Sequence, residues 1–286
     1  MNTKTVFLYG QYRVHAPENS AGFLTCILPY MLDEMSKNRV RPAVLIIPGG
    51  GYGEVSDREA EPVALQFAAR GYAAFILKYS VAPHRFPTAL REAAMAMRFI
   101  RENAQDWLID PNKIAAIGFS AGAHLCGTLG TMYDCPEVQD IADAATIRPD
   151  ALGLCYPVAV SWGKTHEGSF KNLCGEDLPL RQRLSLDKLV RADMPPVFLW
   201  HTRTDAVVPV RNSLVLADAL DAAGVPFALH IYNRGPHGLS VINTQVYREG
   251  KVPACSADTH SWVGSMLGFF EEMGLKITDL PATEEK

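Results

Sequence analysis

The sequence predicts an α/β fold, with a mostly parallel central sheet and helices on both of its faces. Short apolar runs of strand length alternate with amphipathic helical stretches along most of the 286 residues. Runs such as AVLIIP and KIAAIGF are continuously apolar, which is typical of parallel strands buried on both sides. No linker-like stretch or internal repeat divides the chain, so residues 1–286 are predicted to form a single domain.

The first third of the chain is predicted to hold four strands and one helix. The strands are expected at residues 4–9, 23–31, 43–48 and 72–79, and the first two form an antiparallel start. Ser56 and Glu59 have the spacing of a capping box, in which both side chains cap the first turn of a helix. Gly71 stands where a helix C-terminal glycine belongs. A helix is therefore expected between Ser56 and Gly71.

The middle of the chain is predicted to form a helix, a turn, a strand and a second helix. The first helix starts near Thr88, and apolar residues recur on one face from Leu90 to Ile100. Asp110-Pro111-Asn112 indicates a turn. The strand at 113–119 runs directly into Ser120 and the small-residue helix AGAHLCGTLGT.

The last part of the chain continues the alternation, with one exception. Strands are expected at 151–156, 197–201 and 227–232, with a helix ending at Gly224 and a final helix at roughly 258–273. Residues 160–194 have mixed polarity and weak periodicity. Long irregular stretches inside a compact domain are usually functional, and this one follows the C-terminal end of a strand. We therefore expect it to face substrate.

Charge and cysteine usage exclude several function classes. The net charge is −4 and the basic residues are scattered, so neither nucleic acid nor an anionic membrane is an expected partner. The N-terminal region lacks a signal-peptide pattern, and no apolar run is long enough to span a bilayer. The six cysteines form no C-x-x-C pair. Reduced cysteines and a cytoplasmic protein are expected.

The segment Gly118-Phe119-Ser120-Ala121-Gly122 fits the nucleophile elbow G-x-S-x-G. In this motif a strand turns sharply into a helix and exposes the serine hydroxyl, and the flanking glycines let the backbones pass without Cβ clashes. The apolar strand before Ser120 and the helix-compatible run after it supply the required context. The alternative is that Ser120 is a small turn residue in a packing motif.

A serine nucleophile needs a histidine base, and three histidines lie beyond residue 201. His230 is inside an apolar strand, and His260 opens the last helix. His237 lies in the loop RGPHG just after the last core strand, where a base can reach across the end of the sheet. His237 is therefore the predicted base.

The acid that orients the histidine should lie between Ser120 and His237 in the sequence. Asp205 fits, because it follows the strand PVFLWH by a few residues. The other candidates are expected in caps or on solvated surfaces; they are Asp187, Asp193, Asp218 and Asp221.

The tetrahedral intermediate of acyl transfer needs backbone N–H donors. One is expected from Ala121, directly after the nucleophile, and the other from the loop Gly49-Gly50-Gly51-Tyr52. A triple glycine can also cradle a phosphate, but neither a Walker motif nor G-x-G-x-x-G is present.

Together these motifs resemble the esterase branch of the α/β-hydrolases, which includes the hormone-sensitive-lipase-like esterases and bacterial carbohydrate acetyl esterases. IIPGGGYG resembles their oxyanion loop, KYSVAPHRFPTALRE a stretch that follows it, and IDPNKIAAIGFSAGAHL their elbow. PPVFLWHTRTDAVVPV and GPHGLS match the acid and base loops. The resemblance covers roughly residues 40–270. Pro48 departs from the family by replacing the histidine before the glycines, and no helical cap is visible at the N-terminus.

The resemblance implies Ser120, Asp205 and His237 as a catalytic triad. It also implies the N–H groups of Gly50, Gly51 and Ala121 as the oxyanion hole. The absence of the helical cap favours the acetyl-esterase relatives, which act on acetylated sugars such as xylan fragments. The expected substrate is therefore a small-molecule or oligosaccharide ester, and no metal or organic cofactor is expected.

Two further expectations concern the surroundings of the site. Tyr52 and Trp162 are expected to contact substrate, and His166 and Phe170 are candidates because they lie in the irregular segment. The sequence leaves open whether the chain forms a homo-oligomer.

Two rival functions remain. The elbow also resembles that of arylformamidases, and peptidases share the acid loop, so amide hydrolysis is the first rival. The second is a binding protein that kept the fold without its activity.

Overall fold

A computed structural model describes residues 1–30, 34 and 39–279 of the chain. Within these residues, a sheet of nine strands has the order β1-β2-β4-β3-β5-β6-β7-β8, and β9 pairs with β3. The strands are β1 Asn2–Phe7, β2 Phe23–Leu28, β3 Arg39–Ile47, β4 Ala73–Lys78, β5 Ile109–Phe119, β6 Ala151–Cys155, β7 Val197–Thr202, β8 Phe227–Tyr232 and β9 Thr278–Asp279. All neighbours from β4 to β8 run parallel, whereas β1, β2 and β9 pair antiparallel. The predicted fold class and the antiparallel start are confirmed.

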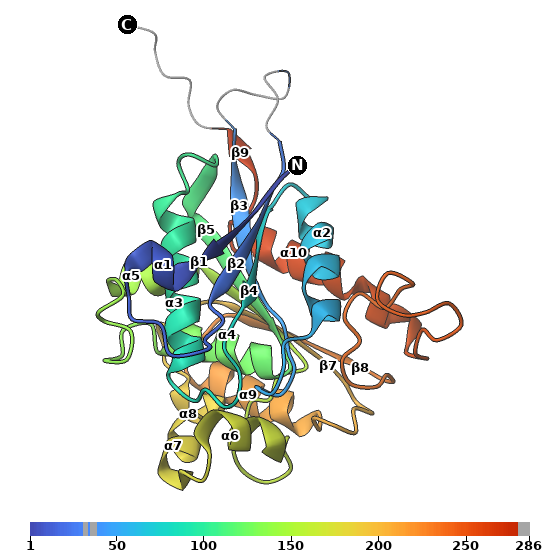
Figure 1. Cartoon of the computed structure of the whole chain (residues 1–286). Coiled ribbons are helices and arrows are strands. Elements are labelled where there is room, and N and C mark those ends of the chain that lie inside the picture. The colour runs from blue at the N-terminus through green and yellow to red at the C-terminus, as the bar shows by residue number, and fades with distance from the viewer. Residues whose placement is uncertain (31–33, 35–38, 280–286) are drawn as a thin grey trace, which may run out of the picture.

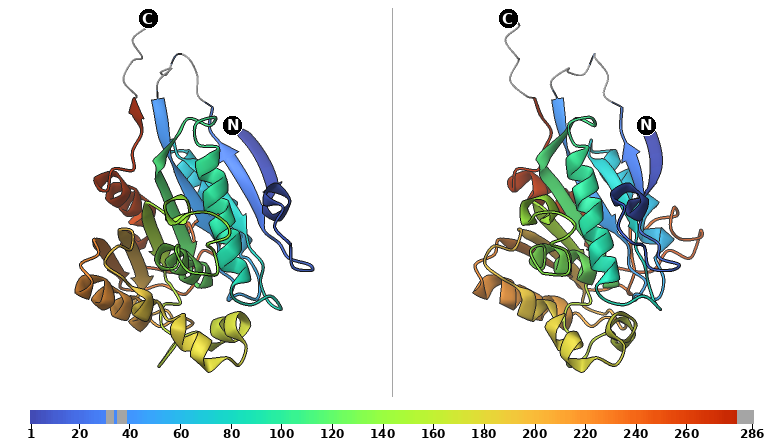
Figure 2. Two further views of the ribbon diagram at one scale, coloured as in Figure 1. Left: turned by 90° about the vertical axis from the view of Figure 1, so that its left-hand side faces the viewer. Right: turned by 60° about the vertical axis from the view of Figure 1, so that its left-hand side comes forward.

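Helices cover both faces of this sheet (Figures 1 and 2). They are α1 Leu8–Tyr12, α2 Glu61–Ala68, α3 Thr88–Glu102, α4 Ala121–Thr131, α5 Ala144–Ile147, α6 Glu167–Cys174, α7 Leu178–Arg183, α8 Leu186–Leu189, α9 Arg211–Ala222 and α10 Trp262–Glu272. Two short 3-10 turns, η1 Asp57–Glu59 and η2 Ala257–Ser261, precede α2 and α10. In Figure 1, α3 and α5 lie on one side of the sheet, and α2 and α10 lie on the other.

Two hydrophobic cores result, one on each face of the sheet. Alternate residues of β3 enter different cores: Leu45 packs with the core under α1, α3, α4 and α9, and Ile46 packs with the core under α2 and α10. Both side chains are fully buried. Such strands cannot alternate polar and apolar residues, which is why β3 reads as a continuous apolar run. Burial of each large aliphatic side chain contributes about 1.5–3 kcal/mol.

Several predicted element boundaries differ from the structure near the N-terminus. β1 ends at Phe7, and the next residues form α1 instead of extending the strand to residue 9. β2 ends at Leu28; the predicted end at Met31 lies outside the described residues. The predicted capping box is wrong, because Ser56 makes no capping hydrogen bond and the Glu59 side chain bonds the glycine loop after β3.

Two regions predicted to be irregular are partly ordered. Asp110 and Asn112 lie inside β5, where the register with β3 shifts, and the Asp110 carboxylate accepts the Asn112 N–H in a local turn. Residues 160–194 contain α6, α7 and α8, which are too short to give a clear helical period. Each of the three helices has a polar N-cap residue; for α7 it is Asp177, whose carboxylate accepts the N–H of Leu180.

Candidate active site

The predicted elbow forms at the junction of β5 and α4. Ser120 has φ 54° and ψ −116°, a conformation that costs energy for a residue with a side chain and that turns the strand sharply into the helix. The glycines on either side allow the close approach. A Cβ on Gly118 would lie 2.3 Å from the carbonyl oxygen of Gly122, and a Cβ on Gly122 would lie 2.2 Å from that of Pro48. Neither position has room for any other residue.

Parallel strands bring the other predicted side chains to the same edge of the sheet. Asp205 follows β7 and His237 follows β8, so both lie at the C-terminal ends of strands, as Ser120 does. His237 Nε2 lies 2.8 Å from Ser120 Oγ, and His237 Nδ1 lies 2.6 Å from Asp205 Oδ2. The structure therefore brings Ser120, His237 and Asp205 into one hydrogen-bonded row, although 117 residues separate the serine from the histidine.

Asp205 determines which nitrogen of His237 carries the proton. Its other oxygen, Oδ1, accepts the N–H groups of Val207 and Val208, both at 2.9 Å. Burial raises the pKa of Asp205, but hydrogen bonds from His201 and His237 outweigh that effect and leave the pKa well below its usual range. An ionised carboxylate only accepts hydrogen bonds, so Nδ1 of His237 carries the proton and Nε2 presents its lone pair to Ser120.

A second histidine, His201 at the end of β7, supports the acid. It is fully buried, and its Nε2 lies 2.9 Å from the carbonyl oxygen of Val208 and 3.3 Å from Asp205 Oδ2. The carbonyl can only accept, so Nε2 bears the proton, and Nδ1 accepts the Ser213 hydroxyl at 2.7 Å. His201 therefore fixes the loop that carries Asp205.

The glycine loop after β3 lies against the elbow. The N–H of Gly49 is already used, because it donates to Glu59 Oε2 at 2.8 Å. Gly50 has φ +126°, and a Cβ there would lie 2.1 Å from the carbonyl oxygen of Glu54, so only glycine fits. Among the residues described, the N–H groups of Gly50, Gly51 and Ala121 donate to no protein acceptor. These three donors are available to a ligand.

A cavity of about 300 Å³ opens at this point. Ser120, His237, Gly50 and Gly51 line it, together with His166 and the segment between Glu54 and Glu59. Burial, and then the nearby His237, lower the pKa of His166. Its Nδ1 is held by Ser169, so a neutral ring at this position carries its proton on Nε2.

Two residues predicted to contact substrate are not brought to this cavity. The Tyr52 side chain is buried, and its hydroxyl is bonded to Nδ1 of His124 at 2.8 Å. Trp162 is exposed, and its indole N–H donates to Asp187. Phe170 is buried and packs edge-on against His124, so His166 alone of the aromatic candidates in residues 160–194 reaches the cavity.

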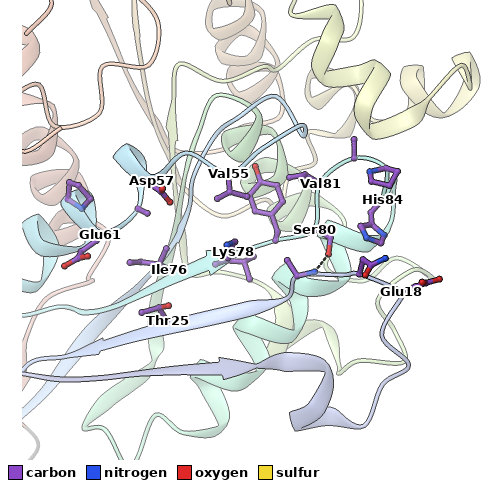
Figure 3. A pocket seen from close by; sticks show the side chains of 18 residues that line it. Glu18, Thr25, Val55, Asp57, Glu61, Ile76, Lys78, Ser80, Val81 and His84 are labelled. Carbon is purple, nitrogen blue, oxygen red and sulfur yellow. Dashed lines mark hydrogen bonds between the residues drawn. The ribbon is translucent and has the colours of Figure 1, made fainter. Parts of the chain in front are cut away.

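A larger cavity of about 910 Å³ is shown in Figure 3. The segment after the glycine loop separates the two: Val55 and Asp57 face the larger cavity, whereas Ser56 and Arg58 face the smaller one. None of the three residues in the hydrogen-bonded row lines the larger cavity. Its serine, Ser80, donates to a carboxylate and not to a histidine.

Within the described residues, no group of three or more His, Cys, Asp or Glu side chains is arranged to hold a metal ion. In the same part of the chain, no helix has the length and apolar character needed to cross a bilayer.

The sequence analysis did not assign Arg58, Glu59, Tyr156 or His201 to the site. Glu59 and Tyr156 are joined by a hydrogen bond of 2.7 Å beneath the cavity, although 97 residues separate them. No spacing pattern connects them, so only the fold reveals the contact. The sequence holds one sign that His201 could belong to the site, because it is a histidine at the end of an otherwise apolar strand.

Two family models match different parts of the chain. The BD-FAE family matches residues 30–150, which include the glycine loop and Ser120. The prolyl oligopeptidase family matches residues 171–254, which include Asp205 and His237.

Two curated proteins are similar to most of the chain. Endo-1,4-beta-xylanase B of Butyrivibrio fibrisolvens is 39% identical over 244 residues, which are 80% of this chain and 37% of that protein. The acetylxylan esterase of Xylanibacter ruminicola is 28% identical over 237 residues, covering 80% of this chain and 46% of that protein. The chain thus spans less than half the length of these two relatives.

Solved structures match over nearly their full length. An acetyl ester-xyloside bifunctional hydrolase from Caldicellulosiruptor lactoaceticus has a TM-score of 0.80 and 35% identity, covering 96% of this chain and 97% of that one. The α/β hydrolase MGS-M1, from a deep-sea metagenome library, has a TM-score of 0.75 and 33% identity, covering 96% and 98%. The carboxylesterase Cest-2923 of Lactobacillus plantarum has a TM-score of 0.81 and 25% identity, covering 96% and 99%.

Proposed function

We propose that this chain, which belongs to the α/β-hydrolase family, is a carboxylic ester hydrolase that removes short acyl groups, chiefly acetyl, from esterified sugars such as xylo-oligosaccharides. We propose further that Ser120, His237 and Asp205 are its catalytic triad. The observation that carries the proposal is the row of hydrogen bonds from Ser120 through His237 to Asp205, at 2.8 and 2.6 Å, opening on a cavity.

In the proposed first step, His237 Nε2 takes the hydroxyl proton while Ser120 Oγ attacks the ester carbonyl carbon. The negative charge that develops on the carbonyl oxygen is held by the N–H groups of Gly50, Gly51 and Ala121, which have no protein acceptor in the described structure. Asp205 keeps His237 in the required tautomer and stabilises the imidazolium. His237 then gives its proton to the leaving alcohol, and an acyl-serine remains.

The second step repeats the first with water. His237 takes a proton from a water molecule, the resulting hydroxide attacks the acyl carbon, and Ser120 leaves with the proton returned by His237. A short acyl group is favoured by size, because the cavity of about 300 Å³ must hold both the acyl and alcohol sides of the ester. The sugar alcohol is supported by the xylan-related names of two relatives and one solved structure.

The test is hydrolysis of p-nitrophenyl acetate and butyrate by the wild type and by Ser120→Ala. We expect acetate to be cleaved faster than butyrate, and Ser120→Ala to lose turnover by a factor on the order of 10⁶. Ser265→Ala, on α10 outside the cavity, is the matched control and should keep full activity. Release of acetate from acetylated xylo-oligosaccharides then tests the alcohol side. A wild type no faster than Ser120→Ala would overturn the proposal.

Amide hydrolysis is the second candidate, because the prolyl oligopeptidase family matches residues 171–254. A panel that pairs each acetyl ester with the corresponding anilide and formamide separates the two candidates. If the anilide or formamide is turned over faster than the ester, the amide function replaces the ester function.

A further inference from the structure

The carboxylate of Glu59 is buried under the proposed active site and bonded at both oxygens. Glu59 belongs to the η1 turn, and only 3% of its surface is exposed. Oε2 accepts the N–H of Gly49 at 2.8 Å, and Oε1 accepts the hydroxyl of Tyr156 at 2.7 Å. Gly49 directly precedes the proposed oxyanion donors Gly50 and Gly51, so Glu59 holds the base of their loop.

Tyr156 connects this carboxylate to the loop of the proposed base. Its ring packs edge-on against His237, with 5.1 Å between ring centroids and an interplanar angle of 70°. Its hydroxyl oxygen accepts the N–H of Ser240 at 3.1 Å, three residues after His237. The Ser240 hydroxyl in turn donates to the carbonyl oxygen of Arg58, the residue before Glu59. The oxyanion loop and the histidine loop are thus tied together through one buried acid.

We propose that Glu59 is a positioning residue for ester hydrolysis, which holds the oxyanion loop through Gly49 and places a second negative charge beside His237. This inference rests on the proposed function. Asp205 bonds the imidazole directly, whereas Glu59 acts across the ring of Tyr156. The imidazolium that forms as Ser120 attacks is therefore bonded to one carboxylate and interacts with the charge of a second across the Tyr156 ring.

The hydrogen bonds favour the ionised form of Glu59. A neutral carboxyl group would need an acceptor for its own proton, and the Gly49 N–H cannot serve as one. Tyr156 would have to give up its donated bond to accept instead. Burial is the largest influence and raises the pKa of Glu59; the bonds from Tyr156 and Gly49 and the positive charges of His237 and Arg58 offset only part of that rise. The negative charge beside His237 therefore develops as pH rises through this raised pKa. Tyr79, Cys155 and Tyr247 are the remaining titratable groups whose charges interact with Glu59.

Three variants separate the charge of Glu59 from its hydrogen bonds. Glu59→Gln keeps the size, an acceptor for Gly49 and a polar partner for Tyr156, but it removes the charge. Glu59→Ala removes both the charge and the bonds. Tyr156→Phe removes one bond and keeps the charge. Glu61→Gln, an exposed site on α2 that lines the other cavity, is the matched control.

The measurements are kcat and KM for p-nitrophenyl acetate between pH 5 and 9, with wild type and Ser120→Ala alongside. In Glu59→Gln we expect the acid limb of kcat/KM to move to lower pH by about half a unit or more, because the imidazolium loses a neighbouring negative charge. We expect kcat to fall about tenfold, with KM changed less than about threefold. In Glu59→Ala kcat should fall on the order of 10²-fold, as for loss of an oxyanion donor.

Tyr156→Phe should lower kcat and leave the acid limb in place, which a general loss of structure would not do. Glu61→Gln should match the wild type. If Glu59→Gln changes neither the acid limb nor kcat, the inference is overturned. The proposed function still stands in that case, provided that the wild type remains far faster than Ser120→Ala. If Glu59→Gln does not fold, a kcat for folded Tyr156→Phe equal to that of the wild type overturns the inference instead. A wild type no faster than Ser120→Ala overturns both this inference and the proposed function.

Discussion

Asp205→Asn replaces one carboxylate oxygen by an amide nitrogen, and the contacts around this residue dictate how the new group must lie. Oδ1 of Asp205 accepts two backbone N–H groups, from Val207 and Val208, each at 2.9 Å. The asparagine oxygen has to stay there, because an amide NH₂ facing two donors would lose both hydrogen bonds. The NH₂ is therefore forced into the Oδ2 position, 2.6 Å from His237 Nδ1 and 3.3 Å from His201 Nε2.

This orientation reverses the tautomer of His237. Facing an amide donor, Nδ1 has to accept, so the proton moves to Nε2, which then cannot take the proton of Ser120. In Ser-His-Asp proteases the equivalent change leaves the geometry intact and lowers kcat about 10⁴-fold, which is roughly 5.4 kcal/mol of transition-state stabilisation. We expect kcat to fall about 10³- to 10⁴-fold in this enzyme. The larger value applies if His201, whose Nε2–H faces the new amide NH₂, keeps its orientation.

The assay is kcat for p-nitrophenyl acetate at neutral pH, with urea unfolding to establish that the variant is folded. Asp218→Asn makes the same chemical change at an exposed position of α9 and should leave kcat unchanged. The substrate KM should change little in either variant, because Asp205 does not line the cavity. A folded Asp205→Asn enzyme that keeps kcat within tenfold of the wild type would refute the reasoning about the tautomer.

Three further predictions follow from contacts and charges in the structure. Gly122→Ala would place a Cβ 2.2 Å from the carbonyl oxygen of Pro48, so we expect the free energy of unfolding in urea to fall by about 1–3 kcal/mol. The control is Gly264→Ala, on a helix where a Cβ would meet nothing within 4 Å, and it should raise this free energy by about 0.5–1 kcal/mol. Equal effects of the two substitutions would contradict the packing argument. His166→Asn keeps a polar residue at the start of α6 but withdraws the imidazole from the cavity, so KM for acetylated xylo-oligosaccharides should rise about three- to tenfold while kcat changes less, and an unchanged KM would remove His166 from substrate binding. Burial raises the pKa of Glu59 in the folded protein, so the stabilisation that comes from its protonated form is fully present below an unfolded pKa of about 4.3 and is lost as pH rises through the folded pKa. The stability of the wild type relative to Glu59→Gln should therefore decrease from pH 4 to pH 7 in urea titrations, and a difference that does not vary with pH would count against a perturbed Glu59.

The strands were predictable because burial on both faces leaves a plain mark on the sequence. β7, which is buried along its whole length, extends only one residue beyond the predicted end at His201. β8, at the edge of the sheet and mostly half-buried, also lies at residues 227–232 as expected. The region from residue 160 to residue 194 was harder, because α6, α7 and α8 have eight, six and four residues. A helix that short completes about two turns or fewer, so no apolar period can be seen.

The elbow shows how a local signal and a distant one differ. Two glycines spaced around Ser120 are needed because neighbouring backbones leave no room for Cβ atoms, and this need is visible within five residues. The partners of Glu59 are Gly49 and Tyr156, and the second lies 97 residues away. In the sequence, Glu59 fits a capping box equally well. Local spacing therefore assigned it the wrong partner.

The sequence by itself determined the class of fold, the elbow at Ser120 and the two loops that carry Asp205 and His237, because each depends on local backbone chemistry or on burial within one strand. The tertiary structure decided which groups surround the candidate site: His201 behind Asp205, Glu59 under the glycine loop, and, among the aromatic candidates named from the sequence, His166 instead of Tyr52 and Trp162 at the cavity. Apart from His201, which lies only four residues before Asp205, these groups come together from separate strands and loops. Their contacts exist only after the parallel strands have aligned their C-terminal ends, and no pattern within a single segment encodes them.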